Sequence, residues 1–565
     1  MRRLADFGPL SPAEQQLCDE VCEKELVILG DGTRPGAAAG PDRQVRASFL
    51  RYLILGGCDA LPGMIPERGV RVAGALVVGE LDLEGTRIPR DVGLLQCRFD
   101  SVPNFRSTRI DTLNLSGSAL PGLNADRLRA EGGVILREVA VTGEIRLSGA
   151  KLGGDLDCDG ARFTAGDSGR ALFADGLLAE GGVFLRGVEA TGEIRLGGAK
   201  LGGDLDCDGA RFTAGDSGRA LFADGLRAEG NVFLRGAEAT GEIRLGGAKL
   251  GGSVDCEGAR LTAGKSGWAL NAAGAEIDGG FFLREGARID GVLDLTAARF
   301  GSLNDDAACW PKPGNLALNR CQYDAFTGGP VTAAARIRWL DLQDPARWGT
   351  DFWPQPWEHC AKVLREMGHA EAARQVLIAK EVRQRADRRR RRREDGNYLT
   401  ASWRWFWDTV LRFSVRYGHQ PLFAFLWLMM LWGAGVGIFG YAAATDAIKP
   451  NNAFVLRSAE WVTCAPGYAP PPGSDGVARN TGGSQLDCFL NQPEAASYPA
   501  FNAWVYSADT LLPIVAMEMQ EFWIPDETQG TRGRATRVFL WLQIIAGWAL
   551  SLLAVAGFSG LVRSD

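Results

Sequence analysis

A repeat of 49 residues dominates the middle of this 565-residue chain. The sequence Ala-Glu-Gly-Gly-Val at residues 130–134 returns, with one change at most, at residues 179–183 and 228–232. Cys158, Cys207 and Cys256 keep the same spacing. A fixed period of this length is typical of repeat folds, in which each unit buries its apolar face against the next unit. We therefore expect the repeats to form a solenoid.

A shorter unit within each period predicts strands. In residues 192–201 and 203–212, apolar and polar residues alternate over about four positions before glycine interrupts them. Two such units make a coil of about 20–22 residues, and two coils with a short excursion at residues 213–217 fill one period. Related units run from about residue 70 to about residue 300. About ten coils, stacked ~4.8 Å apart, predict a rod of roughly 50 Å.

Small and apolar residues recur within these units, as where Leu201 follows Ala199 by two positions and Phe212 follows Ala210. In this the repeats resemble the pentapeptide-repeat family, which implies a right-handed, quadrilateral β-helix. The expected fold is therefore mainly β. It comprises a helical N-terminal cap (residues 1–66), the β-helix (67–305), a helical linker (306–400) and a helical membrane domain (401–565).

The N-terminal region carries helix signals. Ser11, Pro12 and Glu14 match an N-cap, a first-turn proline and a capping-box glutamate. Residues 44–55 predict a second helix. Both helices are expected to cover the open end of the solenoid.

The repeated cysteines and charges have structural interpretations. Equivalent cysteines lie two coils, about 10 Å, apart, which is too far for a disulfide, so we expect them in the core. The charged pairs, such as Glu193 with Arg195 and Asp204 with Asp206, are expected to point outward and keep the rod soluble. A calcium-binding or partner-binding face is the alternative.

A helical hairpin is predicted over residues 354–385, turning at residues 367–369. Six consecutive arginines follow it: Arg388, Arg389, Arg390, Arg391, Arg392 and Arg393. Contact with nucleic acid, a solvated charge run and an anchor on anionic lipid are the three interpretations. Tryptophans at positions 403, 405 and 407 favour the membrane anchor, so we expect lipid and no nucleic acid as the partner.

Two segments are long and apolar enough to cross a bilayer. Residues 421–444 and 538–558 carry no charge, and ~20 apolar residues span ~30 Å of hydrocarbon. With the arginine run inside, the positive-inside rule places the solenoid in the cytoplasm and the loop between the spans outside. There Cys464 and Cys488 are candidates for a disulfide. We expect a multi-pass protein of the cell (inner or plasma) membrane, of bacterial type, without a cleaved signal peptide.

The arginines at positions 532, 534 and 537 lie on what would be the outer side of the second span. They conflict with the orientation that the arginine run favours. A third crossing by residues 503–517 therefore stays an alternative.

Residues 501–525 form a short apolar stretch that Asp509 and Pro513 interrupt, which favours a re-entrant segment over a crossing. The order of span, re-entrant segment and span resembles two-helix pore-loop ion channels. The resemblance covers about residues 421–563, lacks the T-V-G-Y-G filter of potassium channels, and implies an oligomer with a cation path. Polar and bend residues placed to line that path are Asp509, Thr510, Pro513, Glu518, Gln520 and Glu521. An interfacial segment with its acids in water is the alternative.

No catalytic constellation stands out in the sequence, and no cofactor or metal is expected. Glycines at positions 433, 435, 437 and 440 lie inside the first span without a preceding strand, so Gly433 and Gly437 predict close helix packing instead of dinucleotide binding. Proteins that look like this chain often carry the label "membrane-associated oxidoreductase". We expect a non-enzymatic repeat protein whose solenoid binds a partner or assembles and whose membrane part is channel-like. A non-conducting scaffold and a redox enzyme are the alternatives.

Overall fold

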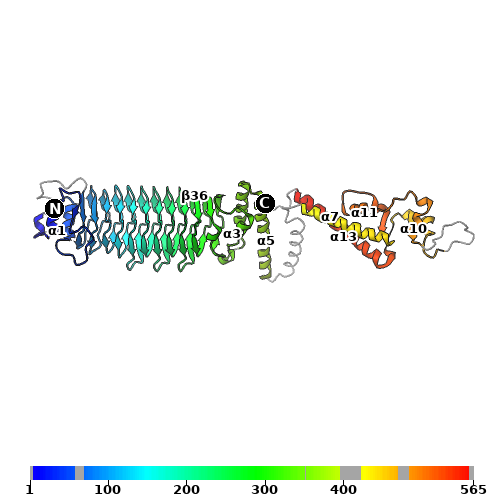
Figure 1. Ribbon diagram of the computed structural model, residues 1–565, viewed down its shortest axis with the longest axis horizontal. Coiled ribbons are helices and arrows are strands. Elements are labelled where there is room, and N and C mark those ends of the chain that lie inside the picture. Colours follow the sequence, from blue (N-terminus) through cyan, green and yellow to red (C-terminus); the bar gives the residue numbers. More distant parts are fainter. Residues whose placement is uncertain (1–3, 58–68, 350, 395–421, 469–482, 559–565) are drawn as a thin grey trace, which may run out of the picture. The chain divides into compact units, whose positions relative to one another are not determined.

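The structure is a computed structural model that describes residues 4–57, 69–349, 351–394, 422–468 and 483–558 (Figure 1). The chain divides into two compact units, Met1–Lys380 and Glu381–Asp565. The first unit contains the repeats, and the second contains two long apolar helices.

Parallel strands of the first unit pair in four ladders, two of which join in one sheet of 21 strands. Ladder I contains β1 (Val27–Ile28), β3 (Val70–Ala73), β6 (Val92–Leu95), β9 (Leu113–Asn114), β13 (Val134–Ile135), β17 (Leu156–Asp157), β21 (Val183–Phe184), β25 (Leu205–Asp206), β29 (Val232–Phe233) and β33 (Val254–Asp255). Ladder II contains β5 (Arg87–Ile88), β8 (Arg109–Ile110), β12 (Arg129–Ala130), β16 (Lys151–Leu152), β20 (Leu178–Ala179), β24 (Lys200–Leu201), β28 (Arg227–Ala228) and β32 (Lys249–Leu250). The two ladders merge at β36 (Glu276–Leu283) and continue through β39 (Arg299–Asp305) and β41 (Gln322–Phe326).

The remaining two ladders form separate sheets of 11 and nine strands. Ladder III contains β2 (Gln44–Arg46), β4 (Leu76–Val78), β7 (Arg98–Phe99), β10 (Ala119–Leu120), β14 (Ala140–Val141), β18 (Arg162–Thr164), β22 (Glu189–Thr191), β26 (Arg211–Thr213), β30 (Glu238–Thr240), β34 (Arg260–Thr262) and β37 (Arg288–Asp290). Ladder IV contains β11 (Leu123–Asn124), β15 (Ile145–Arg146), β19 (Arg170–Phe173), β23 (Glu193–Arg195), β27 (Arg219–Phe222), β31 (Glu242–Arg244), β35 (Trp268–Asn271), β38 (Val292–Asp294) and β40 (Leu316–Ala317).

The register explains the period. Lys151 lies opposite Arg129 and then opposite Leu178, and neighbouring coils are alternately 22 and 27 residues apart in sequence. The longer coils contain the excursions. These long parallel sheets confirm a solenoid-like fold, whereas its handedness and four-sided section stay predictions. Pairing begins at Val27 and ends at Phe326, so it extends beyond residues 67–305 at both ends.

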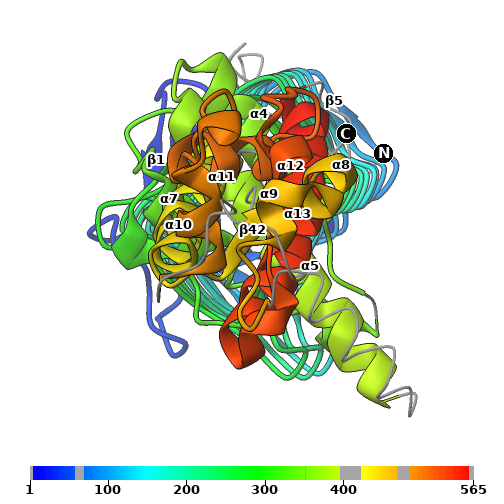
Figure 2. The ribbon, with the colours of Figure 1, turned by 90° about the vertical axis from the view of Figure 1, so that its right-hand side faces the viewer.

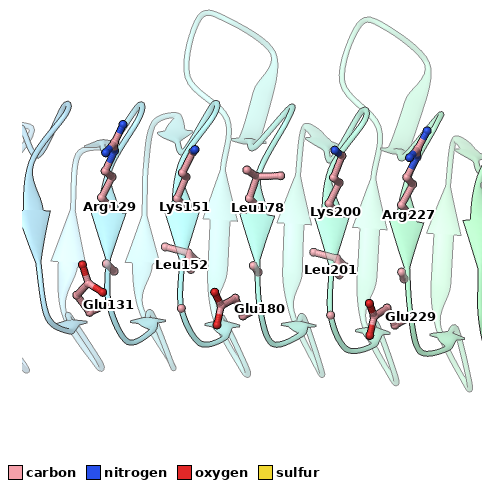
Figure 3. A pocket seen from close by; sticks show the side chains of 15 residues that line it. Arg129, Glu131, Lys151, Leu152, Leu178, Glu180, Lys200, Leu201, Arg227 and Glu229 are labelled. Carbon is pink, nitrogen blue, oxygen red and sulfur yellow. The ribbon is translucent and has the colours of Figure 1, made fainter.

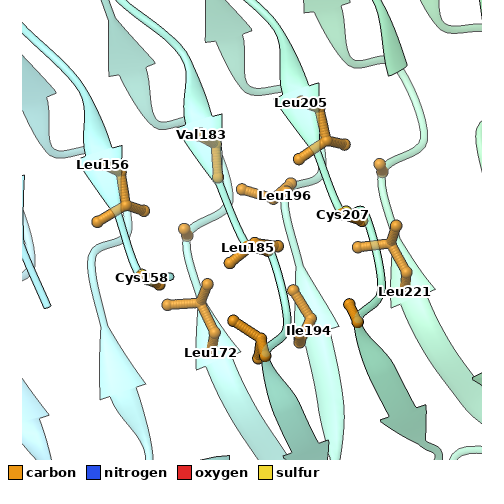
Figure 4. Close-up of a cluster of buried hydrophobic side chains, with 14 of the residues drawn as sticks. Leu156, Cys158, Leu172, Val183, Leu185, Ile194, Leu196, Leu205, Cys207 and Leu221 are labelled. Atoms are coloured by element: carbon orange, nitrogen blue, oxygen red, sulfur yellow. The ribbon is translucent and has the colours of Figure 1, made fainter. Parts of the chain in front are cut away.

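The solenoid core is a stack of small and branched apolar side chains (Figure 4). Leu156, Val183 and Leu205 come from successive coils, and all three are fully buried. Cys158 and Cys207 lie among them as free thiols, and burial raises the pKa of both. The prediction that the repeated cysteines belong to the core is confirmed.

Charges on the repeats are less exposed than expected. Glu193 is 5% exposed and Asp206 8%. Arg195 contacts Asp175 of the preceding coil at 2.7 Å and Glu193 at 3.4 Å. Arg195 and Asp204 are partly exposed, as an outward orientation predicts, whereas Glu193 and Asp206 are buried because arginines of the same coil and of neighbouring coils cover their carboxylates.

Helix α1 (Pro12–Glu20) follows the 3-10 turn η1 (Leu4–Phe7) and has the predicted capping box, in which Ser11 and Glu14 exchange hydrogen bonds. The second helix, α2 (Ala47–Ile54), begins later than residue 44, because Gln44 to Arg46 pair with β4 as strand β2. Arg46 donates to both carboxylate oxygens of Glu14, at 2.8 and 2.7 Å. In the first unit, α1 lies at the N-terminal end of the strand stack (Figure 1).

The last strands of the solenoid pack against helices. These are α3 (Ala333–Leu340), α4 (Gln355–Glu366) and α5 (Ala370–Glu394), with the 3-10 turns η2 (Ala307–Cys309) and η3 (Pro345–Trp348). Arg336 on α3 is fully buried and pairs with Asp305 at 2.7 Å. Its guanidinium also lies 3.7 Å from the ring centroid of Phe326. The predicted helical hairpin is present, and α5 continues beyond residue 385 through the arginine run.

The second unit is built on α7 (Leu422–Ala444) and α13 (Gly530–Phe558), both long and apolar enough to span a membrane. Between them the chain forms β42 (Ile448–Pro450), α8 (Ala453–Arg457), α9 (Ala459–Val462), α10 (Gln485–Leu490), η5 (Pro493–Ala495), α11 (Ala503–Leu511), α12 (Met519–Phe522), β43 (Trp523–Pro525) and η6 (Glu527–Gln529). Helix α11 lies beside α7 and α13 (Figures 1 and 2). The predicted tryptophan flank at positions 403, 405 and 407 lies outside the described residues.

Candidate functional site

Residues 499–523 form a hairpin segment. It starts and finishes at the same end of the α7–α13 pair, where α7 ends and α13 begins. Strand β42 follows α7 directly, and β43 pairs with it antiparallel. The indole Nε1 of Trp523 donates to the carbonyl of Pro499 at 3.0 Å, and the Tyr498 hydroxyl donates to the carbonyl of Phe522 at 2.5 Å. The segment therefore begins and ends at the same place.

Ser507 fixes the depth of the hairpin segment. Its hydroxyl donates to the carbonyl of Trp432 at 2.9 Å, and Nε2 of Gln543 donates to the Ser507 hydroxyl at 3.0 Å and to its carbonyl at 3.2 Å. Trp432 lies near the middle of α7 and Gln543 near the middle of α13. Both side chains, Ser507 and Gln543, are buried. Helix α11 is therefore held about halfway along the two long helices.

Glycines provide room for this contact. A Cβ at Gly435 would lie 2.2 Å from Oγ of Ser507, and one at Gly547 would lie 2.0 Å from the carbonyl oxygen of Leu511. Gly433 and Gly437, which were expected to pack closely, have no atom within 4 Å of such a Cβ among the residues described. The glycine that packs closely in this stretch of α7 is Gly435.

Asp509 organises the return of the hairpin segment. Its side chain is 8% exposed, and its two carboxylate oxygens accept the backbone N–H groups of Met517, at 2.7 Å, and Gln520, at 2.8 Å. The Gln520 amide donates back to the Asp509 carbonyl at 2.7 Å. The structure thus brings Asp509 and Gln520 together, and the Asp509 carboxylate binds the main chain of its own hairpin.

The other predicted site residues lie apart from this contact. Thr510 is buried and donates to the carbonyl of Ser507 at 3.1 Å, and Pro513 is half-buried in the turn. Glu518 and Glu521 are exposed near the C-terminal end of the hairpin segment. Glu518 has a left-handed backbone with φ 62°, which is uncommon for a residue with a side chain. The turn itself is apolar, with Ile514 84% exposed.

Apolar side chains cover the outer surfaces of α7, α13 and the hairpin turn. Those with the largest exposed fractions on the two helices are Leu426, Met429, Met430, Tyr441, Trp541, Leu542, Ile545, Leu552 and Val555. Exposed apolar side chains in this number on two helices are typical of a membrane or protein contact.

Cys464 and Cys488 form a disulfide in the segment between the two long helices, with their Cα atoms 5.7 Å apart. The same segment is joined to the hairpin end, because the side chain of Asn451 donates to the carbonyl of Gln520 at 2.7 Å. Lys449 pairs with Asp526 at 2.9 Å. Burial alone would raise the pKa of Asp526, but hydrogen bonds from Lys449 and Thr528 lower it.

Two groups of arginines precede the apolar stretches of the two long helices in the sequence. Arg388 to Arg391 lie in the last turns of α5, where Arg390 and Arg391 both contact Asp387; Arg392 and Arg393 belong to the same helix. Arg532 and Arg534 lie exposed in the first turns of α13, and Arg537 lies 3.6 Å from Glu527. Helix α13 begins at Gly530, eight residues before the predicted span.

Sequence reasoning missed Ser507, Gly435 and the role of Gln543. Gln543 was the only clear signal, as the most polar residue of the second span.

Within the described ranges, no group of three His, Cys, Asp or Glu side chains could hold a metal ion. Comparisons with protein families, curated proteins and solved structures gave no match.

Proposed function

We propose that the second unit is the membrane part of an oligomeric, channel-like protein, and that residues 499–523 re-enter the membrane without crossing it. The observation that carries this proposal is the pair of contacts at the two ends of the segment, Trp523 to Pro499 and Tyr498 to Phe522. Both ends meet at the end of α7 from which β42 starts, while α11 reaches the middle of α7 and α13. Non-helical backbone at membrane depth requires a protein-lined or watery environment.

The orientation of α11 favours a cation path. Its N-terminus, capped by Asn502, lies at the hairpin mouth, and its C-terminus, at Leu511, lies deep between the long helices. The carbonyl end of a helix carries a partial negative charge. Glu518 and Glu521 add carboxylates near the mouth, where copies around an axis would form rings.

The disulfide and the arginine run support one orientation. Disulfides persist in oxidising compartments, so the segment with Cys464 and Cys488 belongs outside the cell. Arg388 to Arg393 then lie on the cytoplasmic side, against anionic lipid. The protein is thus proposed as a multi-pass protein of the cell membrane whose cytoplasmic solenoid, a right-handed and four-sided β-helix with a helical N-terminal cap, assembles or binds a protein partner.

Planar-bilayer recording tests this proposal. Purified wild-type protein should pass a current that favours cations over anions. A Glu518→Gln, Glu521→Gln double variant should keep the current and lose cation preference, because both side chains are exposed and the substitutions remove only their charge. An oligomeric, correctly folded preparation without current would contradict the proposal.

A non-conducting anchor for a scaffold is the second candidate function. Two observations favour it: the Asp509 carboxylate is used by the main chain, and the hairpin turn exposes Ile514. On this view, deletion of residues 500–525 leaves membrane localisation and solenoid assembly intact. A redox enzyme is the third, and a bound flavin, haem or nicotinamide in the absorption spectrum of the purified protein would support it.

A further inference from the structure

One ladder of the solenoid differs from the others in how its charges are arranged. On ladder III, arginine and glutamate alternate, so Arg211 contacts Glu189 at 3.4 Å and Glu238 at 3.5 Å. On ladder IV, Arg244 contacts Asp224 at 2.7 Å, as Arg195 does Asp175. In the turns that follow the strands of ladder I, Arg235 contacts Asp208. Charges on these ladders therefore neutralise one another between coils.

Ladder II instead stacks charges of one sign. Its strands begin with exposed basic residues, and only Leu178 interrupts the row: Arg87, Arg109, Arg129, Lys151, Lys200, Arg227 and Lys249. Across the described part of the chain, Lys249 is the member of this row with an ion pair, to Glu276 at 2.8 Å. Strands in a ladder lie ~4.8 Å apart, and like charges on facing positions destabilise a sheet. Negative charge from outside the chain would therefore reduce the repulsion within the row.

An acidic row runs beside this basic row on the same face. Glu131, Glu180 and Glu229 each follow a ladder II position by two residues and are exposed. A groove of about 660 Å³ lies between the rows, over the strands from Arg129 to Glu229 (Figure 3). Figure 3 shows the basic side chains along one edge of the groove and the glutamates along the other. A free polyanion placed in it would meet the carboxylates, so the face suits a partner that carries both signs.

We propose that this face is the contact between two copies of the chain. A rotation of 180° about a line parallel to the solenoid axis places the basic row of each copy over the acidic row of the other. The same rotation keeps the coils in step, so Arg129 faces Glu131 of the second copy and Arg227 faces Glu229 of the second copy. Rotation about a line across the solenoid would instead place basic row on basic row. The charges therefore select a parallel pair.

The balance of charge within the groove fits this occupant. Four cations (Arg129, Lys151, Lys200 and Arg227) face three carboxylates, and two copies supply both sets twice. If the copies are anchored in the same membrane, each solenoid meets other solenoids at a higher effective concentration. The pairing concerns the solenoid alone and holds whether or not the membrane unit conducts.

Charge reversal in the full-length protein tests the proposal. A basic-reversed variant carries Arg129→Glu, Lys151→Glu, Lys200→Glu and Arg227→Glu, and an acid-reversed variant carries Glu131→Lys, Glu180→Lys and Glu229→Lys. Each protein is made in two versions that carry different affinity tags. Self-association is then measured at low salt as the amount of one version that co-purifies with the other. We expect association of either variant with itself to fall by about tenfold or more, because like charges then face each other. Co-expression of the two variants should restore association to the wild-type level, since every contact is again between opposite charges.

The control reverses three charges that lie away from this face. Asp167→Lys, Asp216→Lys and Lys265→Glu change three exposed residues of the excursions and should leave association unchanged. Absence of wild-type association, undiminished association of either reversed variant, or failure of the mixture to recover would each overturn the proposal. Bilayer currents from the same preparations separate this outcome from failure of the channel-like function.

Discussion

Asp509 and Gln520 are joined by two hydrogen bonds that close the hairpin segment: the Gln520 N–H donates to the Asp509 carboxylate at 2.8 Å, and the Gln520 amide donates to the Asp509 carbonyl at 2.7 Å. An acidic residue in an apolar segment is readily interpreted as part of an ion path. Here its carboxylate is satisfied by the main chain, so its first role is to hold the shape of the segment. Glu518 and Glu521 are, by contrast, exposed acids of the same segment.

Replacing Asp509 with Asn should loosen the hairpin segment. Asn retains one acceptor oxygen, and its NH₂ group opposes the other N–H donor, so one charge-assisted bond worth about 1.5–3 kcal/mol is lost. Hydrogen exchange at the amides of Met517 and Gln520 should accelerate by about tenfold or more. Glu521→Gln, which changes an exposed carboxylate in the same segment, should leave both amides protected. Equal exchange in all three proteins would contradict the assigned role of Asp509.

Gly435→Ala should displace α11. The added Cβ would meet Ser507 Oγ at 2.2 Å, and overpacking of this kind costs about 1–3 kcal/mol. Thermal unfolding of the protein in detergent should shift to lower temperature. Gly433→Ala and Gly437→Ala are matched controls on the same helix with open space around the new methyl group, and they should be neutral or slightly stabilising. A neutral Gly435→Ala would mean that α11 does not lie against α7 at this depth.

Arg336→Met should destabilise the C-terminal end of the solenoid. The substitution leaves the carboxylate of Asp305 buried without its cation, for which we expect a loss of about 3–5 kcal/mol in the free energy of unfolding of the first unit. Denaturant unfolding followed by tryptophan fluorescence measures it. Arg338→Met, on the exposed side of the same helix, should change stability by less than about 0.5 kcal/mol. Similar effects of the two substitutions would refute the importance of the buried pair.

The segment outside the proposed spans should lose stability in acid. Because the folded state lowers the pKa of Asp526, the unfolded chain binds a proton more readily. The stabilisation by Lys449 and Thr528 is therefore present above the ordinary pKa of 3.8 and is lost as the pH falls through the lower pKa of the folded state. Exchange of the β42–β43 amides, measured from pH 6 down to pH 3, should show this loss. In Asp526→Asn that part of the pH dependence should vanish, and its persistence would assign the effect to another group.

The repeat made the solenoid predictable, because a strict period leaves few ways to bury the apolar positions. The capping box at Ser11 and the buried cysteines were predictable for the same reason, as local patterns with one physical interpretation. Burial of Glu193 was not, since it depends in part on Arg219, which belongs to the neighbouring coil. The start of α2 was missed because Gln44 to Arg46 gain more from pairing with β4 than from a further helical turn.

Less of the candidate site was predictable. The sequence indicated a short, interrupted segment between two spans, yet the contact of Ser507 with Trp432 and Gln543 joins residues far apart in the chain. A spacing rule pointed to Gly433 and Gly437, whereas the helix face toward α11 is that of Gly435. Which glycine packs depends on helix rotation, and an evenly apolar span gives no periodicity from which to read it.

The central claim is that residues 499–523 enter and leave the membrane on one side. A single cysteine at Asn502 lies near the start of the segment and one at Thr528 follows its end, and both positions are exposed. A membrane-impermeant thiol reagent should be applied from either side of sealed vesicles, with the parent chain as background. Labelling of both positions from the side opposite the solenoid is the result we predict. Labelling of the two positions from opposite sides would show a third crossing and contradict the account.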